Sequence, residues 1–190
     1  MKLDKIREVH KSRFIRRYDL EYTMKNGQPK RYEMVSRFPV KTAAQLADSP
    51  SDGVVLIVMS RDKSRVLLNK EFRPAVAKPV YNFPAGLIDP GETPAEAARR
   101  ELWEETGLEM LEELAFWDRS YGAVGISNES ALIFICTADE TRPFGGNHSP
   151  EEEIEPVWVS REEAAAIVQG CDVTARVQMF LGLWAGLAGI

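Results

Sequence analysis

Histidine and cysteine are scarce in this chain of 190 residues, and their scarcity limits the chemistry available to it. His10 and His148 are the only histidines, so a zinc site built from several histidines is excluded. Cys136 and Cys171 are the only cysteines, and their wide separation is not a spacing of metal ligands. We therefore expect two reduced, buried thiols in a cytoplasmic protein.

Long apolar runs and a positive net charge are also missing. Residues 1–7 carry charge throughout and lack the apolar core of a signal peptide. The apolar run at residues 180–190 is too short to span a bilayer, so we expect a helix packed on the protein. The net charge of −5 argues against a general nucleic-acid binder, which needs a basic surface. Neither a membrane nor a nucleic acid is an expected partner.

A β-hairpin is predicted near the N-terminus. The polar turn Lys25-Asn26-Gly27 separates two alternating segments, residues 18–22 and 31–35. Alternation on both sides of an Asn-Gly pair is a strong hairpin signal. A polar break follows at residues 49–53. We place a boundary there, between an N-terminal β appendage of residues 1–50 and a main domain of residues 51–190.

The main domain is predicted to interleave strands with helices. Residues 54–59 form an uninterrupted apolar run, which suits a strand buried on both faces. The remaining patterns predict strands at 65–69, 131–137 and 156–159, helices at 94–106, 161–169 and 174–187, and a loop at 121–130. Such interleaving indicates a layered α/β domain.

The helix predicted at 94–106 has clear signals at both ends. Thr93 can cap its N-terminus, and Glu96 completes a capping box with Thr93. Pro94 suits the first turn, and Gly107 follows the last residue, where a left-handed conformation is needed. A buried stripe is expected to consist of Ala95, Ala98 and Leu102.

Three glutamates lie on another side of this helix. Glu101, Glu104 and Glu105 are spaced i, i+3 and i+4, so their side chains are expected to converge on one patch. Arg100 lies four residues before Glu104 and can relieve part of the repulsion. By itself the cluster fits either a solvated acidic face or a site for a hard cation such as Mg²⁺ or Mn²⁺.

The flanking residues decide between these two interpretations. From Gly86 the chain reads glycine, five residues, Glu92, seven residues, and then Arg100-Glu-Leu-Trp-Glu-Glu-Thr-Gly-Leu108. At typical residue frequencies this pattern would arise by chance about once in 10¹⁰ windows. It resembles the signature of the Nudix hydrolases at every fixed position. The resemblance implies an α/β Nudix fold, an α/β/α sandwich with a mixed central sheet, to which this chain adds an N-terminal antiparallel β appendage.

The resemblance also implies a role for each matching residue. Arg100 would orient a glutamate rather than contact the substrate. Gly86 would let the loop pass close to the metal ions, and Glu92 would brace that loop. The implied cofactor is Mg²⁺, or Mn²⁺ in its place. Its ligands would be Glu101, Glu105, Glu104 and the backbone carbonyl of Ala85.

A general base is expected outside the signature. Hydrolysis of an anionic diphosphate needs charge neutralisation and a proton acceptor rather than a covalent nucleophile, which agrees with a chain poor in histidine. Glu152 precedes the strand predicted at 156–159, as the presumed base does in related enzymes. Glu129 lies in the loop at 121–130 and is the second candidate. Glu151 and Glu153 are expected to be only solvated.

Two further segments resemble the ADP-ribose or ADP-sugar pyrophosphatase branch. These are residues 69–75, which contain an Arg-Pro pair, and residues 82–89, which contain Pro-Ala-Gly. Arg73 would contact a phosphate in that branch, whereas by itself it also fits a surface arginine. Two departures leave the substrate open: Asn82 replaces a usual glutamate, and residues 121–125 lack a common proline.

The N-terminal appendage of that branch pairs with a second subunit and helps to bind the base, so the resemblance implies a homodimer. Tyr32 would be a base-stacking aromatic residue, although an aromatic residue on a hairpin also fits ordinary packing. Arg37 would reach the substrate, and Phe14 would be a second stacking residue.

The expected reaction is therefore hydrolysis of a nucleoside diphosphate linked to a small group, with ADP-ribose giving AMP and ribose 5-phosphate. Two alternatives remain open. One is another Nudix substrate, such as a dinucleoside polyphosphate, a nucleotide cofactor or capped RNA. The other is a Nudix protein that senses a nucleotide without cleaving it. A site for RNA would use the basic residues Lys11, Arg13, Arg16 and Arg17.

Overall fold

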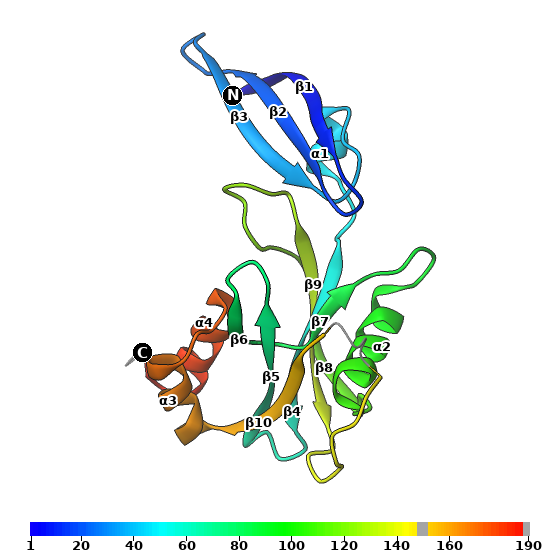
Figure 1. Ribbon diagram of the computed structural model, residues 1–190, viewed down its shortest axis with the longest axis vertical. Helices are drawn as coiled ribbons and strands as arrows, with labels where there is room; N and C mark the ends of the chain where they lie inside the picture. Colours follow the sequence, from blue (N-terminus) through cyan, green and yellow to red (C-terminus); the bar gives the residue numbers. More distant parts are fainter. Residues whose placement is uncertain (148–151, 188–190) are drawn as a thin grey trace. The chain divides into compact units, whose positions relative to one another are not determined.

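The computed structural model describes residues 1–147 and 152–187, which form two compact units. The first unit comprises Met1–Asp52 and Asp118–Ala131, and the second comprises Gly53–Trp117 and Leu132–Ile190. The first unit therefore includes a segment from the middle of the chain as well as the N-terminal part. The elements of both units are labelled in Figure 1.

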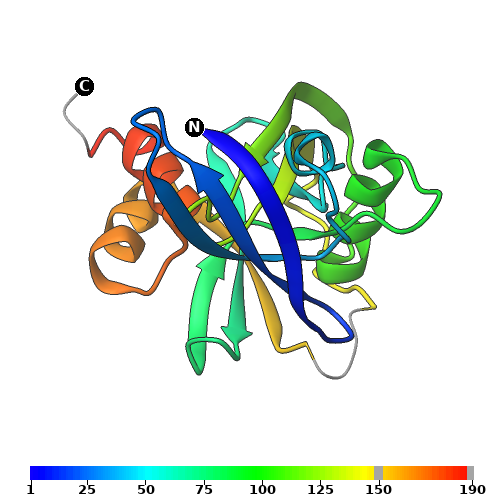
Figure 2. The ribbon, with the colours of Figure 1, turned by 90° about the horizontal axis from the view of Figure 1, so that it is seen from above.

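The first unit contains a three-stranded antiparallel sheet, seen from above in Figure 2. Its strands are β1 (Lys2–Lys11), β2 (Arg16–Thr23) and β3 (Pro29–Ser36), in that order. The predicted hairpin is confirmed as β2–β3, with Gly27 at φ +79° in its turn. Strand β1 was not predicted, because most of its side chains are exposed and two irregularities interrupt its register.

A small apolar core supports this sheet. Tyr18, Leu20, Met34 and Val40 are buried together, and the Tyr18 hydroxyl accepts a hydrogen bond from the Val40 amide at 3.0 Å. A short helix, α1 (Ala43–Ala47), follows and is capped by Thr42. Its five residues are too few to produce a periodic pattern, which is why this helix was not predicted.

The second unit is built on a seven-stranded sheet with helices on both faces (Figure 1). The main strand order is β10-β5-β4-β9-β8, while β6 pairs with β5 and β7 with β4. The ends of β8 and β9 belong to the first unit. The strands are β4 (Gly53–Ser60), β5 (Arg65–Arg73), β6 (Lys78–Asn82), β7 (Ala85–Leu87), β8 (Glu112–Tyr121), β9 (Ser130–Ala138) and β10 (Ile154–Ser160).

Three helices complete this unit. Helix α2 (Pro94–Thr106) covers one face of the sheet, and α3 (Arg161–Gly170) and α4 (Ala175–Trp184) lie on the other (Figure 1). The predicted α/β sandwich with an N-terminal antiparallel sheet is thus confirmed. Every residue of β4 is buried, as its apolar run predicts.

The buried face of α2 differs from the predicted stripe. Ala98 and Leu102 are fully buried, but Ala95 is exposed. The buried face continues toward the C-terminal end of the helix, where it includes Glu105 and Thr106. A helix that buries a glutamate is not recognisable from apolar spacing alone, which is why the predicted stripe was shifted toward the N-terminus.

The two cysteines differ from each other, contrary to the expectation that both are buried. Cys136 is buried in β9, and burial raises the pKa of its thiol to about 12. Cys171 is exposed, because it is the residue that ends α3 at the surface. Both thiols are free.

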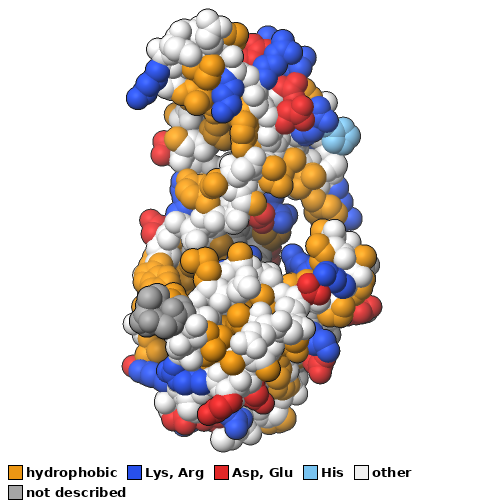
Figure 3. All heavy atoms as spheres, turned by 90° about the vertical axis from the view of Figure 1, so that its left-hand side faces the viewer, with side chains coloured by type: hydrophobic (Ala, Val, Ile, Leu, Met, Phe, Trp, Pro, Cys, Tyr) orange, Lys and Arg blue, Asp and Glu red, His pale blue; other side chains and the backbone are white. Residues whose placement is uncertain are grey.

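No helix in the described part of the chain is long and apolar enough to cross a membrane. Apolar side chains nevertheless reach the surface on the side that carries α3 and α4, which faces the viewer in Figure 3. The exposed apolar residues of α4 include Met179 and Leu183, one helical turn apart.

Candidate active site

The site is formed by the loop after β7 and by helix α2. Thr93 and Glu96 form the predicted capping box at the start of α2, and Gly107 ends it at φ +73°. The loop itself is packed against the helix without spare room. A Cβ atom on Gly86 would lie 1.9 Å from Oε1 of Glu101, and a Cβ on Gly53 would lie 2.2 Å from the Gly86 carbonyl oxygen. Glycine at position 86 therefore allows β7, which leads into the loop, to pass directly over the Glu101 carboxylate.

Arg100 is the centre of an ion-pair network that joins the loop to the helix. Its guanidinium makes a two-pronged pair with Glu92, at 2.8 and 2.9 Å, and donates to the Leu87 carbonyl. It also donates to Glu101 at 2.7 Å and to Glu104 at 3.0 Å. These acceptors, Glu92 first, raise the pKa of Arg100, so the side chain is permanently charged. Glu92 additionally accepts from the Asp89 amide, which supports its expected bracing role.

Glu105 lies on the buried side of α2 and is only 8% exposed. Its Oε2 accepts from Nδ2 of Asn69 at 2.8 Å and from the Ala85 amide at 3.2 Å. Burial, followed by the nearby negative charge of Glu101, raises the pKa of Glu105 to about 9. Two hydrogen bonds therefore compensate only part of the cost of burying this carboxylate.

Glu101 is also largely buried, and its pKa is raised by burial despite the contact with Arg100. Glu101 interacts electrostatically with both Glu104 and Glu105, but the three glutamates do not share one set of hydrogen-bond partners. Glu101 and Glu104 share the Arg100 guanidinium, whereas Glu105 is held by Asn69 and Ala85. Among the described residues, no three acidic, histidine or cysteine side chains form a ready-made metal cluster.

The donor chemistry nevertheless fits a hard divalent cation. Glu105 is buried and Glu101 largely so, and the negative charge of Glu101 raises the cost of ionising Glu105, which a bound cation would offset. The missing Cβ of Gly86 lets strand β7 lie close to the Glu101 carboxylate. Glu101, Glu105 and Glu104 are therefore the residues that could hold the cation, with the Ala85 carbonyl as the expected backbone ligand.

Comparison with known proteins gives the same answer as the signature. The family model described as NUDIX domain matches residues 50–176, which is more than half of the chain. The chain belongs to the Nudix family. Residues 86–108 are its Nudix signature, and α2 is its Nudix helix.

Several curated Nudix proteins are similar to this chain. An uncharacterized Nudix hydrolase of Schizosaccharomyces pombe is 29% identical over 175 residues, covering 85% of this chain and 81% of the relative. An ADP-ribose pyrophosphatase of Bacillus subtilis is 26% identical over 121 residues, covering 64% and 65%. Nudix hydrolase 19 of Arabidopsis thaliana is 32% identical over 110 residues, covering 58% of this chain but 24% of the relative. The chain thus spans about a quarter of the Arabidopsis protein and just under two thirds of the Bacillus protein.

Strand β5 contributes a row of polar side chains beside the Nudix helix. Asn69, Glu71 and Arg73 alternate along the strand and so share one face. Glu71 pairs with Arg73 and contributes to raising the pKa of Glu105, so its carboxylate lies near the site. Sequence analysis named Arg73 but missed Asn69 and Glu71. The available signal was a buried polar residue directly after the apolar run Val66-Leu67-Leu68, followed by polar residues at alternate positions.

The two candidate bases lie in different units. Glu152 precedes β10, and its negative charge contributes to raising the pKa of Glu101, which places the two carboxylates near each other. Glu129 lies in the first unit, where it pairs with Arg37 at 3.2 Å. Glu153 is exposed as expected, and Glu151 lies outside the described residues.

Asn82, which replaces the usual glutamate, is buried and accepts a hydrogen bond from the Thr174 hydroxyl at 3.2 Å. Thr174 is the residue before α4, and its side chain makes no capping bond to that helix. Asn82 therefore connects β6 to the start of α4. In this chain the position serves a contact within the fold.

The remaining predicted substrate residues belong to the first unit. Tyr32 donates its hydroxyl hydrogen to the carbonyls of Val124 and Gly125. It also lines a cavity of about 200 Å³ together with Tyr22 and Tyr121. Phe14 lies in the turn between β1 and β2, is 65% exposed, and has the Arg13 guanidinium 4.9 Å from its ring centre.

The C-terminal end of the Nudix helix is held by a later segment. The amides of Gly145 and Asn147 donate to the carbonyls of Thr106 and Glu104, at 2.9 and 2.8 Å. We call residues 143–147 the strap. It is closely packed, because a Cβ on Gly146 would lie 2.4 Å from the Glu104 carbonyl oxygen. The strap thus satisfies helix carbonyls that would otherwise lack partners.

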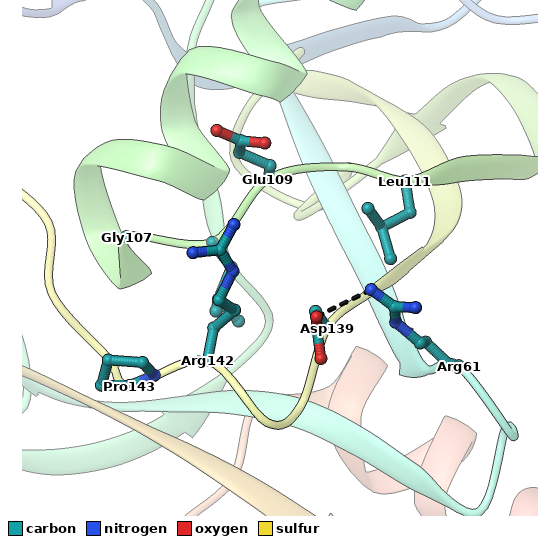
Figure 4. A pocket seen from close by; sticks show the side chains of 8 residues that line it. Arg61, Gly107, Glu109, Leu111, Asp139, Arg142 and Pro143 are labelled. Carbon is teal, nitrogen blue, oxygen red and sulfur yellow. Dashed lines mark hydrogen bonds and ion pairs between the residues drawn. The ribbon is translucent and has the colours of Figure 1, made fainter.

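A cavity of about 270 Å³ lies beside this end of the helix (Figure 4). The Arg61–Asp139 ion pair lines one side, and Arg142 and Pro143 line another, close to Gly107. The last turn of α2 has no basic residue of its own. The nearby Arg142 places positive charge where the helix dipole is negative. We interpret this cavity as part of the packing of the strap.

Proposed function

We propose that this Nudix protein hydrolyses the diphosphate bond of a nucleoside diphosphate linked to a small moiety, and that ADP-ribose, giving AMP and ribose 5-phosphate, is its substrate. The observation that carries the proposal is the pair of buried carboxylates, Glu101 and Glu105, on the Nudix helix beside Gly86. The choice of ADP-ribose is supported by relatives named ADP-ribose pyrophosphatase, among them the Bacillus protein.

The proposed cofactor is Mg²⁺, with Mn²⁺ able to replace it. It would be held by Glu101, Glu105 and Glu104 with the carbonyl of Ala85. When bound, the cation supplies positive charge that stabilises the negative phosphate oxygens. Arg100 does not need to contact the substrate, because its donors already engage Glu92, Glu101 and Glu104.

The proposed step is attack of a water molecule on one phosphorus atom of the diphosphate. Glu152 accepts a proton from that water as its oxygen bonds to phosphorus. The bond from this phosphorus to the bridging oxygen breaks, and the second phosphate leaves with the electron pair. Arg73, oriented by Glu71, contacts a phosphate oxygen and helps to fix the substrate.

For the nucleoside end of the substrate we propose Tyr32 as an aromatic contact to the base, with Phe14 as a second one and Arg37 as a polar contact. The cavity bounded by Tyr22, Tyr32 and Tyr121 supports this assignment. We also propose that two copies of the chain associate through the first unit as a homodimer.

The alternative substrates are distinguished by two observations. The glutamate usual in the ADP-sugar branch is replaced by Asn82, which contacts Thr174 within the fold, so one feature of that branch is missing. The basic N-terminal residues give little support to RNA binding, because Arg16 pairs with Glu8, and Arg17 lies between Asp19 and Glu33. A dinucleoside polyphosphate or a nucleotide cofactor is therefore the stronger alternative.

The first experiment is a magnesium-dependent turnover panel with ADP-ribose, other nucleotide sugars, dinucleoside polyphosphates, nucleotide cofactors and a capped RNA. We expect AMP and ribose 5-phosphate from ADP-ribose, and a loss of about 10³-fold or more in the Glu105→Gln control. Cleavage of another substrate only would refute the choice of ADP-ribose. Nucleotide binding without any cleavage would identify a sensor instead.

The general base is tested separately. Glu152→Gln is expected to lower kcat by about 10²–10⁴-fold while leaving KM nearly unchanged. Glu153→Gln is the matched control, because its side chain is exposed one residue away. Unchanged turnover in Glu152→Gln, with a loss in Glu129→Gln, would assign the base to Glu129.

A further inference from the structure

Asn69 is an unusual residue for its place in the fold. It lies in β5, is 1% exposed, and follows the fully buried residues Val66, Leu67 and Leu68. Asparagine is depleted in strands, and a buried amide needs partners for its oxygen as well as its nitrogen. The neighbouring strand places Asn82 directly opposite it.

The side-chain amide of Asn69 is only half satisfied. Its Nδ2 donates to Oε2 of Glu105 at 2.8 Å, but its buried Oδ1 has no hydrogen-bond partner among the described residues. The amide nitrogen of Asn69 faces Oε2 of Glu105, which also accepts from the Ala85 amide. Leaving Oδ1 unsatisfied costs stability, which an apolar side chain at this position would avoid.

Asn69 restricts the orientation of the Glu105 carboxylate. Both donors that reach Glu105 from the described residues end on Oε2, and they approach from different elements, β5 and β7. Two donors on one oxygen restrict rotation of the carboxylate about its last bond. Oε1 is consequently left without a donor and available to another ligand.

We propose that Asn69 is a positioning residue of the metal site, which fixes the Glu105 carboxylate so that Oε1 is held ready for a divalent cation. The inference rests on the proposed function, since it assumes that Glu105 is a metal ligand. Asn69 itself contacts neither substrate nor cation in this proposal. Residues that orient a metal ligand commonly change metal affinity by about 10–100-fold when they are replaced.

The test is a titration of the protein with Mn²⁺ alone, without substrate. Electron paramagnetic resonance measures the concentration of free Mn²⁺ at each step. Asn69→Ala is expected to bind Mn²⁺ about 10–100-fold more weakly than the unmodified chain. Asn82→Ala is the matched control. Asn82 is also a buried asparagine and lies directly opposite Asn69 on the neighbouring strand, but its hydrogen-bond partner is Thr174. That control should melt at a lower temperature but keep its Mn²⁺ affinity within about threefold. If Asn69→Ala does not fold, Asn69→Ser replaces it.

A second measurement separates positioning from general loosening. The Mg²⁺ concentration that gives half-maximal activity should rise in Asn69→Ala, and kcat should recover in part at high Mg²⁺. Equal Mn²⁺ affinity in Asn69→Ala and the unmodified chain would overturn the inference but leave the proposed function standing. Equal weakening in Asn69→Ala and Asn82→Ala would overturn it as well. No Mn²⁺ binding by the unmodified chain would overturn both.

Discussion

Among single residues, Glu105 connects stability to function most directly. Its carboxylate is buried, lies close to the negative charge of Glu101, and accepts hydrogen bonds from two donors within residues 1–147 and 152–187. Burying a charge in this way is unfavourable unless an opposite charge compensates for it. Ionising Glu105 in the folded chain is therefore unfavourable without a cation, and a cation bound there would stabilise the charged form.

Replacing Glu105 by glutamine should make this cost measurable. In EDTA, Glu105→Gln is expected to be more stable than the unmodified chain by about 1–3 kcal/mol. Glutamine is neutral and can be buried without taking up a proton, and its oxygen can still accept from Asn69 and Ala85. Added Mg²⁺ should raise the Tm of the unmodified chain and leave that of the variant unchanged. Thermal unfolding in both buffers checks this, and a variant that melts lower in EDTA would contradict it.

At the scale of elements, the Nudix helix is held at its two ends in different ways. Its N-terminus is capped locally by Thr93 and Glu96. Its C-terminal carbonyls are satisfied in part by the strap, about forty residues further along the chain. The strap fits against the helix only because Gly146 has no side chain and adopts φ +113°.

Two adjacent glycines of the strap provide a matched comparison. Gly146→Ala should destabilise the fold by about 1–3 kcal/mol and lower turnover, because its Cβ would displace the backbone of Glu104. Gly145→Ala should have little effect, since a Cβ there meets no atom within 4 Å. Urea unfolding measures the free energy of unfolding of both variants, and steady-state kinetics measures their turnover. Similar losses in the two variants would mean that the strap does not fit as described.

These elements also show how far the sequence could be interpreted without a structure. The limits of α2 and its capping box were predicted correctly, because Thr93, Glu96 and Gly107 act on neighbouring residues. The strap was not predicted, since its hydrogen bonds join segments that are far apart in the chain. Asn69 was missed for the same reason: its partner Glu105 lies 36 residues away.

Strands were predicted where apolar residues run or alternate clearly, as in β4. Strand β1 was missed because its charged residues face solvent on most positions. The candidate metal ligands followed from the signature, but the direction of each carboxylate did not. Arg100 draws Glu101 and Glu104 together, while Asn69 holds Glu105. Spacing on a helix gives the face of a side chain and leaves its partners undetermined.

For the whole molecule, exposed apolar residues bear on the proposed dimer. Phe14 in the first unit and Met179 in the second are 65% and 69% exposed. If two copies associate through the first unit, Phe14→Asp should weaken the dimer at least about tenfold, whereas Met179→Asp should not. Light scattering after gel filtration over a range of concentrations measures this. A monomeric unmodified chain, or a dimer lost only in Met179→Asp, would refute the proposed interface.

The strap also makes the integrity of the site observable from its own backbone. The amide hydrogens of Gly145 and Asn147 are bonded to the last turn of the Nudix helix, whose residues include Glu104 and Glu105. These amides can exchange with deuterium only when the strap separates from that turn. Their exchange rates would therefore report how often this end of the helix opens, independently of any substrate or spectroscopic probe.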